Sequence, residues 1–138
     1  MKKVLITGSS SGIGKATAEL FLKNDVPVVG IARQHKKFIH KSKLYEPIEA
    51  DLSLIESLPK LITTILQEHP DIDVFIGNAG YGDFQSIENF SANQIQNFLN
   101  LNLISHITLC RFIVSHMKYE KNGTIFFIGS ESGLVGKK

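Results

Sequence analysis

Gly8, Gly12 and Gly14 punctuate the segment Thr7–Gly14, whose sequence T-G-S-S-S-G-I-G is suited to binding phosphate. A glycine-rich turn between a parallel strand and a helix lets backbone amides approach a pyrophosphate, and the helix N-terminus adds unpaired N–H groups and a favourable dipole. An ordinary tight connection is the alternative interpretation. We predict that a dinucleotide pyrophosphate binds to these residues: Gly8, Ser10, Ser11, Gly12, Ile13 and Gly14.

Two further groups of polar and small residues follow apolar runs later in the chain. Asp51-Leu52 comes after Leu44–Ala50, and Asn78-Ala79-Gly80 comes after Asp73–Gly77. Open α/β sheets bind ligands beyond the carboxyl ends of their strands, so both groups are candidate cofactor contacts. The Asp51 carboxylate could accept a hydrogen bond from an exocyclic amine, or it could simply start a turn. The small residues at 78–80 could pass closely under a ribose or form an ordinary loop.

The choice of dinucleotide depends on the end of the second expected strand. In dinucleotide-binding folds an acid there bonds the ribose 2′-hydroxyl, whereas a nearby arginine accommodates a 2′-phosphate. Ala32 stands at the position of the acid, Arg33 follows it, and there is no carboxylate between Asp25 and Glu46. The basic residues could also belong to a solvated loop. The pattern favours NADP over NAD as the cofactor.

Short β-branched runs alternate with longer helical patterns, as in a parallel α/β sheet. We expect strands at Lys3–Ile6, Pro27–Ile31, Leu44–Ala50, Asp73–Gly77 and Thr124–Ile128, and helices at Gly12–Asn24, Ser57–Glu68 and Ser91–Lys118. The polar and basic segment Arg33–Lys43 is expected to be a loop or short turn.

The longest expected helix carries two residues that need an explanation. It starts at a capping box, because Ser91 and Gln94 match the pattern S-x-x-Q. Asn102 falls on its apolar side, where a buried amide must find partners, and Asn100 is a competing candidate for that role. Cys110 is expected to be a packed thiol rather than a reactive one.

These landmarks together resemble the short-chain dehydrogenase/reductase family. The segment Thr7–Gly14 resembles the family's T-G-x-x-x-G-I-G turn, and Asn78-Ala79-Gly80 matches the last three letters of its N-N-A-G motif. Gly77 departs from the first letter of that motif. The resemblance implies a Rossmann-type, doubly wound parallel sheet of about five strands in order 3-2-1-4-5. It also implies that residues 1–138 form a single dinucleotide-binding domain, truncated relative to the family.

The resemblance assigns roles to residues that are ambiguous alone. It implies that Asp51 and Leu52 lie beside the adenine, and that Asn102 is the family's structural and proton-relay asparagine. It also implies that Ser130 is the catalytic serine, although by its position at a strand end Ser130 would more often be a turn residue. The implied reaction is hydride transfer between NADP(H) and a carbonyl or alcohol substrate.

One part of the family's machinery does not occur in these 138 residues. Resembling proteins carry a Tyr-x-x-x-Lys pair, in which the tyrosine is the general acid and base and the lysine lowers its pKa. None of the three tyrosines here has a lysine four residues later. We therefore expect the 138 residues alone to be inactive. The alternatives are a non-catalytic dinucleotide-binding module and a degenerate remnant stabilised by self-association; Asn102 and Ser130 favour descent from a working reductase.

Composition limits the remaining possibilities. The chain is 43% hydrophobic with a net charge of +2, which argues against a dedicated nucleic-acid binder. A single cysteine allows no internal disulfide, and no apolar run approaches the ~20 residues of a membrane helix, so we expect a cytoplasmic protein. We identify no metal site. The apolar fifth strand would form a sheet edge, so we expect a homodimer or larger assembly.

Overall fold

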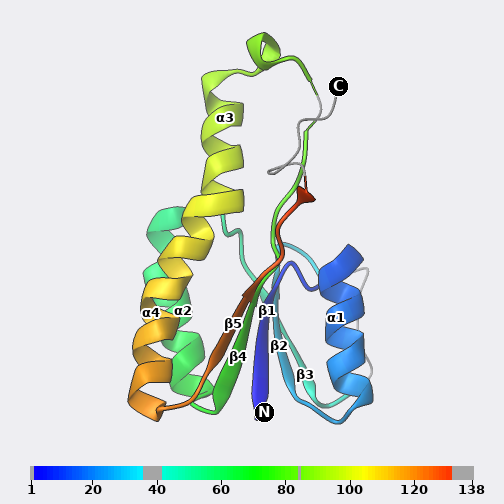
Figure 1. Ribbon diagram of the computed structural model, residues 1–138, viewed down its shortest axis with the longest axis vertical. Coiled ribbons are helices and arrows are strands. Elements are labelled where there is room, and N and C mark those ends of the chain that lie inside the picture. Colours follow the sequence, from blue (N-terminus) through cyan, green and yellow to red (C-terminus); the bar gives the residue numbers. More distant parts are fainter. Residues whose placement is uncertain (1, 36–41, 84, 132–138) are drawn as a thin grey trace.

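The computed structural model describes residues 2–35, 42–83 and 85–131 and contains a five-stranded parallel sheet (Figure 1). Its order is β3-β2-β1-β4-β5, as the resemblance implied. The strands are β1 (Lys3–Thr7), β2 (Val28–Ala32), β3 (Tyr45–Glu49), β4 (Ile72–Gly77) and β5 (Thr124–Phe127). All five agree with the expected strands to within one residue at each end, which is closer than sequence patterns usually place strand boundaries.

The three central strands are buried on both faces, which explains why their sequences are apolar without alternation. Every residue of β2 and β4 is buried, as are the last four residues of β1. Helix α1 (Gly12–Lys23) covers one face, and helices α2 (Leu58–Glu68) and α4 (Ser105–Glu120) cover the other (Figure 1). The sheet therefore has a separate hydrophobic cluster on each side.

The expected helix Ser91–Lys118 is one continuous helical stretch with an irregular middle. Helix α3 (Ala92–Leu99) begins at the predicted capping box, in which Ser91 Oγ accepts from the Gln94 amide and the Gln94 side chain accepts from the Ser91 amide. A π-helical segment, Asn100–Ile104, then joins α3 to α4. The expected helix is therefore present, with a π-helical segment that the sequence analysis did not predict.

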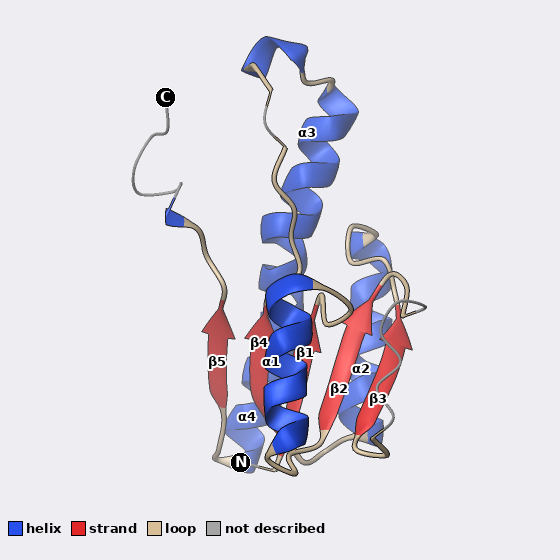
Figure 2. Cartoon of the chain, turned by 90° about the vertical axis from the view of Figure 1, so that its right-hand side faces the viewer, coloured by secondary structure: helices blue, strands red, loops and turns tan. Residues whose placement is uncertain are grey.

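Figure 2 shows that all five strands point toward one edge of the sheet, and that α3 rises beyond that edge. Glycine turns, polar side chains and the π-helical segment therefore meet at the same end of the molecule. Parallel sheets place their ligand sites at this end, because every strand-to-helix loop begins there.

The stretch Ala92–Glu120 is more exposed than a core helix. Leu109, Ile113 and Met117 of α4 pack into the core. Among the described residues, this stretch alone is long and apolar enough to cross a membrane by length and composition, and only 22% of its most apolar window is buried. The expectation concerned uninterrupted apolar runs, and the polar residues Asn100, Asn102 and His106 interrupt this stretch.

Candidate functional site

A cleft of about 1530 Å³ opens at the carboxyl edge of the sheet. The loops after all five strands and the π-helical segment contribute to its lining. Twelve of the fourteen predicted site residues line it: Gly8, Ser10, Ser11, Gly12, Ile13, Arg33, Leu52, Asn78, Ala79, Gly80, Asn102 and Ser130. Gly14 and Asp51 are not among the lining residues, and the structure gives each of them a different role.

The turn after β1 is shaped by two glycines with positive φ. Gly8 has φ 69° and Gly12 has φ 52°, a conformation that other residues rarely adopt. A Cβ on Gly8 would lie 2.9 Å from Asn78 Nδ2, so glycine is also needed for close approach to β4. Ser11 caps α1 without a side-chain hydrogen bond, which leaves amides at the helix start available to an anion.

Gly14 has a packing role that the sequence analysis did not identify. It is buried in the first turn of α1, and a Cβ there would collide with the Gly8 carbonyl and with Asn78 Nδ2. The contact of Gly14 with a pyrophosphate stays a prediction. Its missing side chain lets α1 sit close against the turn, beside the Gly8 carbonyl and Asn78 Nδ2.

Thr7 joins the glycine turn to the end of β4. Its buried Oγ1 accepts hydrogen bonds from the amides of Asn78 and Ala79, each at 2.9 Å. Asn78 Nδ2 in turn donates to the carbonyls of Thr7 and Gly8, at 3.0 and 3.3 Å. The sequence analysis missed this role of Thr7, although a polar residue at the end of an apolar strand is a signal of it.

The two competing asparagines of the π-helical segment both hold loops. Asn102 Oδ1 accepts from the Tyr81 amide and Asn102 Nδ2 donates to the Tyr81 carbonyl, both at 2.9 Å. Asn100 Nδ2 donates to the Ser53 carbonyl at 3.2 Å. Asn102 thus fixes the loop after β4 and Asn100 fixes the loop after β3. Asn102 lines the cleft, and its proton-relay role stays a prediction.

Asp51 takes the alternative role that its sequence context left open. Its Oδ1 accepts from the Ser53 hydroxyl at 2.7 Å and from the Ser53 amide at 2.9 Å, which makes a turn. These two bonds, with a smaller contribution from Arg33, lower the pKa of the Asp51 carboxyl. These bonds hold Oδ1 in its own loop, and the position of Asp51 beside an adenine stays a prediction. Leu52, which is buried, lines the cleft instead.

The end of β2 places Arg33 at the cleft. The Ala50 amide donates to the Ala32 carbonyl at 3.0 Å, which continues the pairing of β2 with β3, and Arg33 then emerges exposed. Two residues later, His35 is buried, at 6% exposure, which the sequence analysis did not predict. Residues 36–41 of the expected loop Arg33–Lys43 lie outside the described residues.

His106 and Phe127 explain the departure at Gly77. Their rings pack edge-on with centroids 5.8 Å apart. A Cβ on Gly77 would lie 2.6 Å from Phe127 and 2.9 Å from His106, so the asparagine of the N-N-A-G motif would not fit here. Burial lowers the pKa of His106, whose Nε2 lies 3.5 Å from Thr7 Oγ1. The sequence analysis had placed His106 on the long helix without a role at the site.

Ser130 follows β5 and lines the cleft. In the sheet, β5 is separated by β1 and β4 from β2, which Arg33 follows. The Ile128 amide donates to the Gly77 carbonyl at 3.0 Å, so the chain stays paired with β4 until two residues before Ser130. The position agrees with a serine that faces a bound substrate, and the catalytic role stays a prediction.

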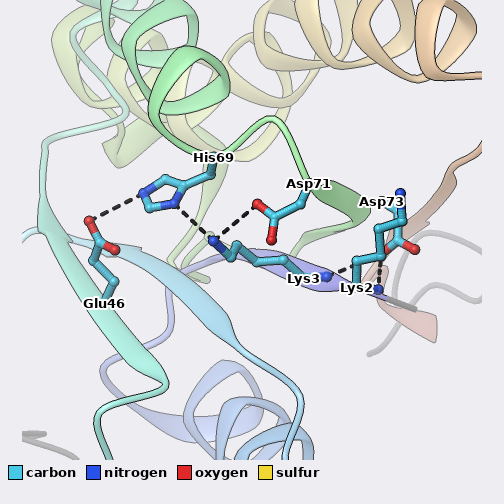
Figure 3. A network of polar contacts seen from close by, with 6 residues as sticks. All are labelled: Lys2, Lys3, Glu46, His69, Asp71 and Asp73. Carbon is cyan, nitrogen blue, oxygen red and sulfur yellow. Dashed lines mark hydrogen bonds and ion pairs between the residues drawn. The ribbon is translucent and has the colours of Figure 1, made fainter.

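A second polar cluster lies at the opposite end of the sheet (Figure 3). Ligand atoms of Glu46, Glu68 and His69 lie within 4.8 Å of one another, so these residues could hold a metal ion. Lys3 Nζ, however, donates to His69 Nδ1 at 3.1 Å, and His69 Nε2 lies 3.2 Å from Glu46 Oε1. Both ring nitrogens are therefore engaged, and the nearby ammonium opposes a cation.

Comparisons with known proteins agree with the fold. The family model for short chain dehydrogenase matches residues 2–138. The 3-ketodihydrosphingosine reductase of Bacteroides thetaiotaomicron is 29% identical over 133 residues, which are 96% of this chain and 48% of that protein.

Two solved structures also match. ElxO with NADP bound has a TM-score of 0.87 at 28% identity, covering 99% of this chain and 58% of that one. The 4-hydroxyisoleucine dehydrogenase complexed with NADH has a TM-score of 0.89 at 25% identity, covering 99% and 59%. The chain spans about half the length of the curated relatives that it matches. It belongs to the short-chain dehydrogenase family.

Proposed function

We propose that this chain is the cofactor-binding part of an oxidoreductase that interconverts carbonyl and alcohol substrates, with NADP(H) as the cofactor. The observation that carries the proposal is the convergence of the glycine turn, the loop at 78–80 and Arg33 on one cleft. Amides at the start of α1 would hold the pyrophosphate, and the 78–80 loop would lie along a ribose.

The preference for NADP rests on the charges around Arg33. Ala32 offers no carboxylate to a 2′-hydroxyl, and the nearby Asp51 carboxylate is bound to Ser53. Arg33 is exposed at the cleft, where its guanidinium can pair with a 2′-phosphate. The solved relatives include NADP-bound and NADH-bound proteins, so the preference depends on this chain's own residues.

A bound nicotinamide dinucleotide supplies or accepts a hydride. On the side of this chain, Ser130 orients the substrate carbonyl from the end of β5, while Asn102 keeps the Tyr81 loop in place. Proton transfer needs a donor of suitable pKa, and the 138 residues contain no Tyr-x-x-x-Lys pair. We therefore propose that these residues alone bind the cofactor without reducing carbonyls.

The affinity part of the proposal is tested by titrating NADPH and NADH and following nicotinamide fluorescence. The parent chain should bind NADPH about tenfold more tightly, and Arg33→Ala should remove that difference, because a charge-assisted contact is lost. Arg111→Ala is the matched control, since Arg111 is exposed on α4 and does not line the cleft. Equal affinities in the parent would contradict the NADP assignment.

The activity part is tested by NADPH consumption with small ketones and aldehydes. We expect none above background. Consumption that is lost in Ser130→Ala would show that a substitute proton donor exists, and Tyr81 would be the first candidate because it lines the cleft.

A non-catalytic dinucleotide-binding module is the second candidate function. The lack of a Tyr-x-x-x-Lys pair in the 138 residues favours it, because binding a dinucleotide needs no proton donor. Under either function we propose a cytoplasmic protein that forms a homodimer or a larger assembly and binds no nucleic acid. The exposed side chains of Phe126 and Phe127 on β5 support self-association.

A further inference from the structure

A buried chain of hydrogen bonds runs beneath the cleft and has no part in the contacts described above. Ser9 Oγ lies 3.0 Å from the Tyr45 hydroxyl, which lies 3.2 Å from His35 Nδ1. His35 Nε2 lies 3.1 Å from the Ile48 carbonyl. These hydrogen bonds are shielded from solvent, because the three residues Ser9, Tyr45 and His35 are only 0%, 8% and 6% exposed.

The direction of these bonds follows from the last acceptor. A carbonyl oxygen can only accept, so His35 Nε2 donates to Ile48, and in the tautomer with its proton on Nε2 the Nδ1 atom accepts from the Tyr45 hydroxyl. The Tyr45 oxygen then accepts from Ser9, which agrees with the pKa of Tyr45: burial raises it, and the bond from Ser9 opposes that rise.

The absence of a side chain at Gly30 leaves space for the hydrogen bond between Ser9 and Tyr45. A Cβ in the middle of β2 at this position would collide with Ser9 Oγ and with the Tyr45 hydroxyl. Ser9 comes from the glycine turn and Tyr45 from the edge strand β3, so their side chains meet across β2. The bonds therefore join the pyrophosphate turn to the outermost strand.

These hydrogen bonds restrict the backbone of Arg33 and Gln34, which lie between two fixed residues, Ala32 and His35. The Ala32 carbonyl is fixed by the Ala50 amide, and His35 is fixed by its ring and by its own amide, which donates to Glu49 Oε1 at 3.2 Å. Only Arg33 and Gln34 lie between these fixed points, and both are exposed and line the cleft.

We propose that Ser9, Tyr45 and His35 are positioning residues that hold the Arg33-Gln34 segment in register with the pyrophosphate turn, and that this register sets the selectivity for a 2′-phosphate. The inference rests on the proposed function. A guanidinium on a long side chain gains selectivity only if its backbone is held, because otherwise ordering it opposes the contact.

The test uses adenosine 2′,5′-bisphosphate and adenosine 5′-monophosphate, which differ by the 2′-phosphate and need no nicotinamide contacts. The ratio of their dissociation constants, measured by calorimetry, is the readout. Tyr45→Phe removes the bridging hydroxyl and keeps the ring, and it should reduce the ratio about fivefold through weaker bisphosphate binding. Tyr119→Phe, at an 84% exposed tyrosine, is the matched control and should change nothing.

Rescue distinguishes positioning from general stability. His35→Leu should reduce the ratio as Tyr45→Phe does, whereas His35→Gln keeps an N–H for Ile48 and should restore most of it. If Tyr45→Phe fails to fold, Ser9→Ala gives the same test, because it removes the hydroxyl that bonds Tyr45 and adds no bulk. A parent chain that binds neither nucleotide would overturn the proposed function. A parent with a clear preference that stays unchanged in folded Tyr45→Phe or Ser9→Ala would overturn only this inference.

Discussion

The two flanks of the sheet are packed to different degrees. On the β1–α1–β2 flank the Gly8 amide bonds the Ile31 carbonyl at 2.7 Å, and Ser9 reaches Tyr45 across β2. On the β5 flank Phe126 and Phe127 are more than half exposed, and no strand pairs beyond β5 within the residues that the structure describes. The glycine turn after β1 is therefore held by contacts on all sides (the closed flank), whereas β5 is an edge strand with exposed apolar side chains (the open flank).

Because of this difference, we expect that dinucleotide binding and self-association can be altered independently in this chain. The contacts that shape the phosphate turn come from β1, β2, β3 and β4. The apolar surface that can recruit a partner belongs to β5 and to the stretch Ala92–Glu120. Substitutions on one flank should leave the property of the other flank largely intact.

The largest effect is expected at Gly14. In Gly14→Val the side chain would collide with the Gly8 carbonyl, so α1 must move away from the turn. We expect loss of measurable dinucleotide binding and a loss of stability of about 1–3 kcal/mol, the usual range for overpacking. Calorimetric titration and urea unfolding measure the two effects.

Gly129→Ala is the matched control, because a Cβ at Gly129 meets nothing within 4 Å. Gly129 lines the cleft next to Ser130, so this variant is a control for stability, which should not change, and not for dinucleotide binding. Normal binding by Gly14→Val would mean that the dinucleotide site lies elsewhere.

A smaller effect is expected at the open edge. Phe127 packs against Phe75 and His106, so Phe126, its neighbour on the strand, faces the other side of the sheet, where it is 52% exposed. Phe126→Lys should weaken self-association about tenfold, because a charge on an edge strand opposes pairing. Light scattering over a concentration series measures this, and NADPH affinity should not change.

Ile95→Lys tests the helical face in the same assay, since Ile95 is 41% exposed on α3 and does not line the cleft. Dissociation by this variant alone would place the contact on the helix rather than on β5. A parent chain that is monomeric at micromolar concentration would remove the prediction of an assembly.

The smallest effect concerns pH. Folding lowers the pKa of Asp51 below its ordinary value of 3.8, so its bonds to Ser53 stabilise the fold above about pH 4. This contribution is lost as pH falls through the lowered pKa. Asp51→Asn should therefore flatten the acid limb of the stability curve slightly, as measured by urea unfolding between pH 2 and about pH 6. An unchanged acid limb would show that the Asp51–Ser53 turn does not persist in solution.

Local signals were sufficient for most of the fold. The apolar runs of β2 and β4 predicted buried strands because a parallel sheet covers both faces, and the spacing of Ser91 and Gln94 predicted the start of α3. Glycine and small-residue turns after the strands predicted the location of the cleft, since all those turns begin at one edge.

Long-range contacts account for what the sequence did not predict. Asn100 and Asn102 bond residues 53 and 81, and nothing near them in the sequence indicates a π-helical segment. His35 stands among basic residues, and its burial depends on Tyr45, ten residues away. The packing role of Gly14 could not be predicted either, because the Gly8 carbonyl comes close to Gly14 only after the turn has formed.

The most direct test of the central claim is an NMR titration of the 138-residue chain with NADPH. We predict that the largest amide shift changes cluster at residues 8–13, 33–34 and 78–80, on the closed flank and the adjoining end of β4. Changes concentrated on β5 and the Ala92–Glu120 surface, or no changes at millimolar NADPH, would contradict the assignment of this cleft as the dinucleotide site.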